Sequence, residues 1–464
     1  MNGEQLYRLL STIILRDLGK QPEDLIADSR DSCSTNGVAE RLLGTLCPAM
    51  AKNKCISHVL VGTGQHIKMP TLSLFMVYLI QLLTHSHAFK LAFKEVMGES
   101  MPNYSKIRWW SRWDLMEVLA RCFSSIDKLI STLEERGIGE SSTVNLRDIF
   151  DSNWRELRRE LAMVMDLKCF YIATYRLEGD GLEGLRLVEI IEEIRLKGRT
   201  LKELPSNMPN LAAVLRHEIV IDVGTKVYEY FGAPYCSWFT GKVTKVTDGS
   251  PKLYSVKYCD GTTMESEEHE VRRWLRIHDS DEWLKYCDYA SGGFTYLENR
   301  VTDNCPSAFY YKDCYNMWSL ARMFNPSYAA AHLSPDKVDA LSDIVSLRYH
   351  NLIDGMKTEV HAYLTACAGV VVDMSSMHAF TDSVLLFWRC NKLKFPTWAK
   401  AARIMFAMTP NSAGAERVFS LLKMMFPDER TLSLADLVEG SLMLKYNKAK
   451  RKAEKEVLKQ HIRA

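Results

Sequence analysis

The sequence predicts an α/β segment followed by a mainly helical chain, with one small all-β domain inserted into the helical part. Three observations carry this prediction. Apolar residues recur at three- and four-residue steps over most of the chain. A short apolar run between two such stretches near the N-terminus is typical of a buried strand. After Val223 the chain becomes rich in β-branched and aromatic residues and in turn-forming residues.

Composition limits the class of protein. The chain has 464 residues, of which 47% are hydrophobic and 25% are charged, so we expect two to four folded domains. No apolar run approaches the roughly 20 residues of a membrane helix, and a signal peptide is not evident, so we expect a cytosolic or nuclear location and no membrane partner. A net charge of +2 does not identify a partner. Twelve cysteines without a C-x-x-C pair predict reduced thiols.

The N-terminal segment is predicted to be helix, strand and helix. Apolar positions recur at helical spacing over residues 4–17, a short buried strand is expected at residues 25–27, and a second helix is expected at residues 38–46, before Pro48. The intervening residues 28–36 have the composition of a turn.

Helical periodicity dominates the middle of the chain. It extends over residues 72–215 and resumes over residues 279–372, with a loop expected at Gly292-Gly293. Between them, strands at residues 223–231, 238–246 and 253–258 are separated by Gly, Pro and Asp-Gly turns, which predicts a small β-barrel.

The C-terminal part is predicted to form three helices, at residues 398–408, 413–426 and 434–446. All three carry apolar stripes, more than one small core needs, and this pattern favours self-association. The lysine-rich end is expected to be a solvated tail, with a DNA-contacting arm as the alternative.

Asp31 and Asn36 follow the expected strand. A carboxylate at the carboxyl end of a strand in an open α/β sheet is well placed to bind a divalent metal. Asp and Asn also favour Asx turns and helix caps, which require no metal. Both interpretations are open from the residues alone.

Two other motifs have competing interpretations. Cys55-Ile-Ser-His58 has the spacing of half a zinc site, although no second tight pair completes it. The run from Arg108 through Trp109 and Arg112 to Trp113 is dense in tryptophan and arginine, which could stack on bases or bind phosphates. The alternative is a helix start that packs in the core, with Ser111 as its cap.

Taken in order, these motifs resemble those of hAT-type DNA transposases. The resemblance is densest over residues 382–447, which contain Leu386-Phe-Trp388, Phe395-Pro396, and Ser412-Ala413 followed by Glu416-Arg417-Val-Phe419-Ser420. Asp31 with Asn36, Cys55-x-x-His58 and Arg108-Trp109 precede this segment in the family's order.

The resemblance implies an RNase H-like core interrupted by a helical insertion, and a catalytic triad of carboxylates that binds two Mg²⁺ ions. Asp31 would correspond to the second carboxylate, Glu416 to the third, and Trp109 to the tryptophan beside the flipped base. Only 30 residues precede Asp31, and they are predicted to be mainly helical, so the first carboxylate of the triad is not evident. We therefore expect no transposition by this chain alone, and Mg²⁺ only if it is active.

The inserted β-domain resembles a Tudor domain, because it contains Val223-Gly-Thr-Lys-Val, Trp238-Phe-x-Gly241 and Tyr258-x-Asp260-Gly261. Such domains hold methylated lysine by cation–π attraction in an aromatic cage. Candidate cage residues are Tyr230, Trp238, Tyr258 and Asp260. Alternatively, these aromatic residues fill the small core of the domain.

The resemblance and the periodicity together predict a transposase-derived nuclear protein that forms a homodimer or higher oligomer, with DNA and histone tails as further candidate partners. The alternatives are an active metal-dependent nuclease and a chromatin reader. Candidate DNA-binding residues are Arg108, Trp109, Arg112 and Arg417; candidate dimerisation residues are Ala402, Met405, Val418, Phe419, Leu422, Leu437 and Leu442. The expected segments are a partial RNase H-like segment at 1–68, a helical insertion at 69–217, the Tudor-like barrel at 218–276, further helices at 277–381, the dimerisation region at 382–447 and a basic tail at 448–464.

Overall fold

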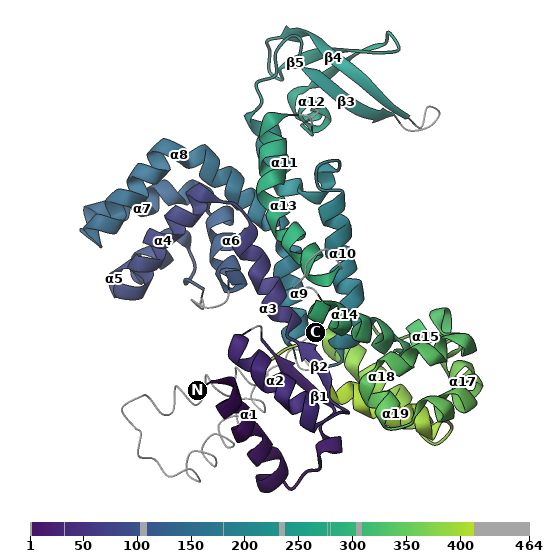
Figure 1. Cartoon of the computed structure of the whole chain (residues 1–464). Coiled ribbons are helices and arrows are strands. Elements are labelled where there is room, and N and C mark those ends of the chain that lie inside the picture. Colours follow the sequence, from purple (N-terminus) through teal and green to yellow (C-terminus); the bar gives the residue numbers. More distant parts are fainter. Residues whose placement is uncertain are drawn as a thin grey trace. The chain divides into compact units, whose positions relative to one another are not determined.

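The computed structural model describes residues 2–412, except 32, 103–108, 180, 232–236, 276, 279 and 303–308. The chain divides into two compact units (Figure 1). Unit 1 contains Met1–His58, Tyr175–Val188 and Pro306–Ala464, and unit 2 contains Val59–Thr174 and Glu189–Cys305. The predominantly helical prediction is confirmed, because the described residues form many helices and only two small sheets. None of the described helices is by itself long and apolar enough to cross a membrane.

Unit 1 begins with a small α/β layer. Helix α1 (Gly3–Thr12) is followed by β1 (Ala27–Arg30), α2 (Ser34–Leu46) and β2 (Ala51–Lys54). The two strands are parallel, with Ala27 opposite Ala51 and Arg30 opposite Lys54, and Figure 1 shows α2 beside them. A parallel pair requires a crossover connection, and α2 provides it.

The strand expected at residues 25–27 was placed too early. It starts at Ala27 and continues through the polar residues Asp28, Ser29 and Arg30. Leu25 packs instead against the cluster formed by Leu43, Cys47 and Met50. The apolar run therefore marks the approach to the strand, while the strand itself is formed by residues that resemble a turn in sequence.

The remaining helices of unit 1 surround an aromatic core. They are α14 (Phe309–Ala321), α15 (Pro326–His332), α16 (Val345–Tyr349), α17 (Ile353–Cys367), α18 (Met377–Asn391) and α19 (Pro396–Ala407). The Tyr363 ring stacks on Trp388 at 5.3 Å and on Trp398 at 4.3 Å. Each polar tip is satisfied, since Tyr363 donates to the carbonyl of Met323 and Trp398 to that of Met356. Buried aromatic residues of this kind contribute large apolar area without leaving unpaired donors.

Unit 2 is built mainly from helices. Its helices include α4 (Pro70–His85), α5 (His87–Met97), α6 (Trp113–Arg121), α7 (Ile126–Glu135), α8 (Glu140–Asp166), α11 (Pro209–Glu218) and α13 (Asp281–Val301). Two buried carboxylates on α8 cap neighbouring helices. Glu160 accepts hydrogen bonds from the backbone N–H groups of Thr71 and Leu72, and Asp166 accepts them from those of Asn210 and Leu211. Helices α3 (Ile56–Thr63), α9 (Lys168–Glu178) and α10 (Leu187–Arg199) have ranges that cross a unit boundary.

The prediction of a loop at Gly292-Gly293 was wrong, because α13 runs through both residues. The two glycines serve close packing instead. A Cβ atom on Gly292 would lie 2.0 Å from the carbonyl oxygen of His66, and one on Gly293 would lie 2.9 Å from Cγ1 of Ile67. Glycine is tolerated in this helix because it permits that approach.

Gly292→Ala is therefore expected to destabilise unit 2. The added methyl would meet a backbone carbonyl, which cannot move aside as a side chain can, and we expect a loss of about 1–3 kcal/mol. Urea unfolding followed by circular dichroism measures this. Ser291→Ala on the same helix is the control and should show no comparable loss; equal stability of the two variants would contradict the packing account.

The inserted β-domain, within unit 2, is an open antiparallel sheet. Its strands β3 (Lys226–Phe231), β4 (Ser237–Thr247), β5 (Leu253–Tyr258) and β6 (Thr263–Glu267) are in sequence order, and α12 (Glu268–Trp274) contacts β3, β5 and β6. The strands were expected to form a barrel, but the sheet that the structure describes does not close. A single bridge between Val227 and Leu275 adds the residue after α12 to the edge of β3.

Candidate functional site

Asp31 lies immediately after β1, in the turn that precedes α2. Its Oδ1 accepts hydrogen bonds from the backbone N–H of Cys33 at 2.9 Å and from the side-chain amide of Asn36 at 2.7 Å. This is the Asx-type arrangement that the sequence left open. The other predicted catalytic residue, Glu416, lies outside the described residues. Within those residues, no three His, Cys, Asp or Glu side chains gather closely enough to bind a metal ion.

The segment that leads to Glu416 is anchored at the ends of β1 and β2. The Ser29 hydroxyl donates to the carbonyl of Asn411 at 3.0 Å, and the Ile56 N–H donates to the carbonyl of Pro410 at 3.0 Å. Residues 409–412 therefore lie beside strands that are more than 350 residues earlier in the chain. This docking places Ser412, the last residue of this segment that the structure describes, beside Cys55 at the end of β2.

Asn53 anchors residues 409–412 to β2, and this role was not predicted from the sequence. It is 0% exposed, and its amide donates to the carbonyl of Thr409. Its Oδ1 accepts from the Cys314 thiol at 2.8 Å and from Nε1 of Trp318 at 3.2 Å. A buried polar side chain must be hydrogen-bonded in this way. The available signal was an asparagine in the middle of a strand, where this residue is uncommon.

Cys55 and His58 act together at the same edge. The Cys55 thiol is 1% exposed, and its Sγ accepts a hydrogen bond from the N–H of Ser412 at 3.2 Å. Burial alone would raise the pKa of this thiol, but the hydrogen bond and charge of His58, together with the Ser412 contact, lower it below its ordinary value. The pair therefore helps to hold the C-terminal segment, and in the described part of the chain it gains no third ligand for zinc.

A group of buried charged side chains lies between β1 and α2. Arg30 on β1 forms an ion pair with Glu40 on α2, and their side chains are 9% and 3% exposed. Asp28 is on the same face of β1. Burial, and next the charge of Glu40, raise the pKa of Asp28 to about 6, while Arg30 opposes this rise. This group of charges was not predicted, because Asp28 and Arg30 were expected to lie in a turn.

Asp28→Asn is expected to stabilise unit 1 at neutral pH. The folded-state pKa of Asp28 lies above its unfolded value of 3.8, so its contribution to stability is complete below about pH 4 and is lost as the pH rises through about 6. Asparagine carries no such cost, and we expect a gain of about 1–3 kcal/mol at pH 7.5. Denaturant unfolding of both proteins between pH 4 and 8 checks this. A difference that does not shrink toward pH 4 would contradict it.

The tryptophan-rich segment mainly serves the core of unit 2. Trp110 and Trp113 are buried, and Nε1 of Trp110 donates to the carbonyl of Leu60 at 2.8 Å. Trp109 is half-buried, and its indole fills the space where a side chain on Gly64 would be. Helix α6 begins after Arg112 without the predicted cap from Ser111. Arg108 lies outside the described residues, so DNA contact by Arg108, Trp109 and Arg112 stays a prediction.

The four cage candidates are not equivalent. Tyr258 is buried at 3% exposure and its hydroxyl donates to Glu229. Asp260 is exposed, and its carboxylate accepts two hydrogen bonds from Thr262 within the turn. Tyr230 and Trp238 are cross-strand partners, and the structure does not describe their side chains. The cage therefore stays a prediction, although Tyr258 and Asp260 already have structural roles.

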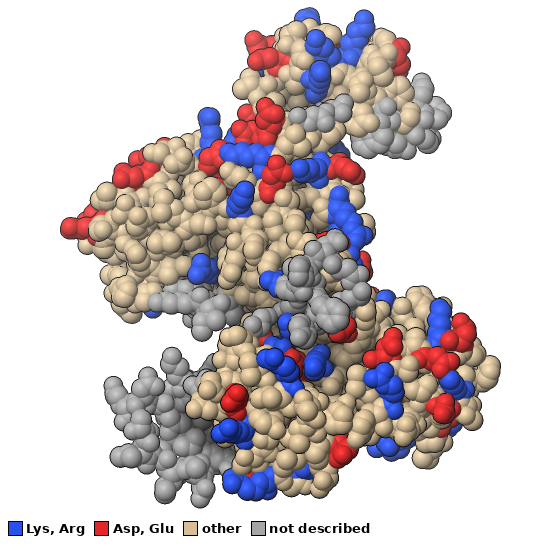
Figure 2. Space-filling model, viewed as in Figure 1, with Lys and Arg blue, Asp and Glu red and all other residues tan. Residues whose placement is uncertain are grey.

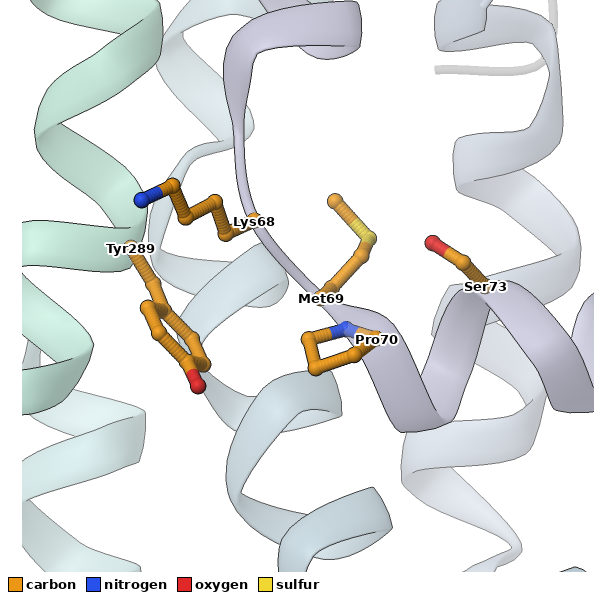
Figure 3. Close-up of a pocket in the computed structure, with 5 residues that line it drawn as sticks. All are labelled: Lys68, Met69, Pro70, Ser73 and Tyr289. Carbon is orange, nitrogen blue, oxygen red and sulfur yellow. The ribbon is translucent and has the colours of Figure 1, made fainter.

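A shallow pocket in unit 2 lies at the start of α4. It has a volume of about 290 Å³ and is lined by Lys68, Met69, Pro70, Ser73 and Tyr289 (Figure 3). Its lining contains one amine and two hydroxyl groups beside the apolar Met69 and Pro70. This pocket does not coincide with any residue singled out from the sequence.

The C-terminal helices of unit 1 lie within a segment that matches a known type of region. Helices α18 and α19 pack on the aromatic core, and residues 409–412 follow them to the sheet edge. Residues 371–447 match the hAT family C-terminal dimerisation region. No curated protein matches the chain.

The match supports transposase-derived dimerisation and self-association. The matched segment begins at residue 371, and the expected boundary of the region at 382 lies within it. Two of its predicted contact residues, Ala402 and Met405, are each 1% exposed and belong to the interior of unit 1. Five others, together with Arg417, lie beyond the described residues: Val418, Phe419, Leu422, Leu437 and Leu442.

Exposed apolar side chains occur elsewhere in the dimerisation region. Val371 is 89% exposed, Leu386 on α18 is 57% exposed, and Leu393 just after α18 is 86% exposed. These residues were not among the expected dimerisation contacts, since helical periodicity alone does not show which apolar residues remain outside the core.

Proposed function

We propose that this protein is a transposase-derived protein whose function depends on self-association through residues 371–447. The observation that carries the proposal is the match of this segment to the hAT dimerisation region. The exposed Leu386 and Leu393 support it, because both belong to the matched segment and neither contributes to the core of unit 1. Further apolar contacts would come from Val418, Phe419, Leu422, Leu437 and Leu442.

The docking of residues 409–412 supports the proposal, because it anchors the part of the matched segment that precedes the candidate contacts. Hydrogen bonds to Ser29, Asn53 and Ile56 hold the segment that connects α19 to the rest of the dimerisation region. A tethered interface loses less conformational entropy on association than a free tail does. The α/β layer would therefore favour self-association by restraining the segment that leads into the candidate contacts.

Co-purification of two differently tagged copies tests the proposal. Both copies are expressed together, and the first tag is captured at physiological salt. We expect the second copy to elute with the first, and mixing after separate purification should give slow exchange. Recovery of only the captured copy would refute self-association.

DNA or chromatin association in the nucleus is the second part of the proposal. Arg108, Trp109, Arg112 and Arg417 are the candidate DNA contacts. The β-domain supplies a candidate reader of histone tails, because a small antiparallel sheet with an aromatic strand pair resembles a Tudor domain. A histone-peptide array without a methylation-dependent signal would count against the reader.

An active metal-dependent nuclease is the alternative function. It is favoured by the position of Asp31 at the carboxyl end of β1, in a parallel βαβ unit like that of an RNase H-like core, and by the docking of Ser412 at the same edge. Asp31 and Glu416 would then bind Mg²⁺ with a further carboxylate. Mg²⁺-dependent nicking of supercoiled DNA, abolished by Glu416→Gln, would support this alternative. An inert wild-type protein would dismiss it.

A further inference from the structure

One face of the β-domain carries a row of lysines. Lys226 on β3 is the direct cross-strand partner of Lys242 on β4, and Lys242 is the direct partner of Lys257 on β5. Lys245 lies one row further along β4, opposite Ser255. All four lysines are exposed. We name Lys226, Lys242 and Lys257 the lysine row.

The lysine row is unfavourable for the sheet by itself. Neighbouring strands are about 4.8 Å apart, so the three side chains start within about 10 Å of one another. Like charges directly opposite in a sheet are destabilising. The described ion pairs of this domain use Lys252, His269 and Arg272 instead of the row. A repeated positive charge that does not serve folding indicates an anionic partner.

The opposite face of the sheet forms the core of the domain. Val227, Val243, Val256 and Tyr258 are buried there together with Val271 of α12. The lysine row alternates with these residues along each strand, so it lies on the face away from the core. In Figure 2, Lys and Arg side chains are prominent over the β-domain, and acidic side chains lie toward its margins. Glu265 and Glu267 are on β6, at the far edge of the sheet.

We propose that the lysine row, with Lys245 beside it, binds the phosphate backbone of a nucleic acid. Charge complementarity carries the choice of partner, because a phosphate backbone presents negative charges at regular short intervals and can contact several lysines of a row at once. Contacts of this kind position a protein on the backbone and do not read sequence. The inference rests on the nucleic-acid association proposed above, and the lysine row lies apart from Arg108, Trp109, Arg112 and Arg417 in the sequence.

The salt dependence of binding tests the proposal on the full-length chain. Fluorescence anisotropy with a labelled single strand and with a labelled duplex, neither chosen for sequence, gives affinity as a function of salt. Each lost phosphate contact reduces the salt slope by about 0.9 on duplex DNA and about 0.7 on a single strand. The triple variant Lys226→Gln, Lys242→Gln, Lys257→Gln is expected to weaken binding at least about tenfold and to lower the duplex slope by about 2–3.

The control neutralises three exposed lysines of the same unit that lie on helices outside the β-domain. These are Lys90, Lys94 and Lys128, on α5 and α7, and the corresponding glutamine variant should keep the wild-type affinity and slope. Thermal unfolding separates binding from folding, because removal of like-charge repulsion should leave the row variant at least as stable as the wild type.

Three outcomes would overturn the proposal. If the wild type binds and the row variant binds equally well with the same slope, nucleic-acid association stands and the lysine row is not its site. If the wild type binds neither probe and does not bind polyglutamate, both the row and the association fail. If it binds polyglutamate but neither oligonucleotide, the row recognises an acidic protein segment instead.

Discussion

Glu40→Ala should destabilise unit 1 by about 3–5 kcal/mol, because it leaves Arg30 buried without its charged partner. Arg30 also donates to the carbonyl of Asp31, so loss of the ion pair would disturb the turn that begins α2. The effect should therefore extend to the strand ends where residues 409–412 dock. Denaturant unfolding at pH 7 measures the loss.

A double variant and a surface control decide whether the ion pair is responsible. Arg30→Met with Glu40→Leu replaces both charges by apolar side chains, and it should recover much of the lost stability. The exposed pair of Arg16 and Asp17 is the control, and Asp17→Ala should change stability little because solvent screens that pair. If Glu40→Ala lowers the free energy of unfolding no more than Asp17→Ala does, the buried ion pair does not stabilise unit 1 as argued.

Deletion of residues 413–464 is expected to convert the protein to a monomer. The deletion retains the docked residues 409–412 and the core of unit 1, but it removes the second part of the dimerisation region, including Val418, Phe419 and Leu422. The exposed Leu386 and Leu393 would remain, but they are too few for a stable interface, which needs about 800 Å² from each partner. Size-exclusion chromatography should show the change.

The matched control deletes only residues 448–464, which follow the dimerisation region. This shorter protein should elute like the wild type, because it loses the basic tail alone. Circular dichroism should show that both deletions retain the helices of units 1 and 2. A long deletion that still elutes as a dimer would place the interface on the described helices instead.

The sequence predicted those features that depend on local patterns. Helical spacing gave most helices of both units, and Asp260-Gly261 and the other turn residues gave the strands of the β-domain. The family signature around Pro410 and Glu416 predicted the dimerisation region, which the family comparison confirms. Each of these depends on residues that are close together in the chain.

Features that depend on distant contacts were missed or misplaced. β1 contains Asp28 and Arg30, which look like turn residues until α2 covers them with Glu40. Gly292 looks like a loop residue because its contact, the carbonyl of His66, is more than 200 residues earlier in the chain. The role of Asn53 depends on Thr409 in the same way. The barrel was expected from strand count, but closure depends on edge pairing, which strand count does not specify.

Sedimentation equilibrium of the intact chain tests the central claim most directly. At micromolar concentration, a self-associating protein should give at least twice the monomer mass of 53.1 kDa, and the mass should fall on dilution. The protein that lacks residues 413–464 should sediment as a single chain under the same conditions. A mass of 53.1 kDa for the intact chain at every concentration would contradict self-association through the dimerisation region.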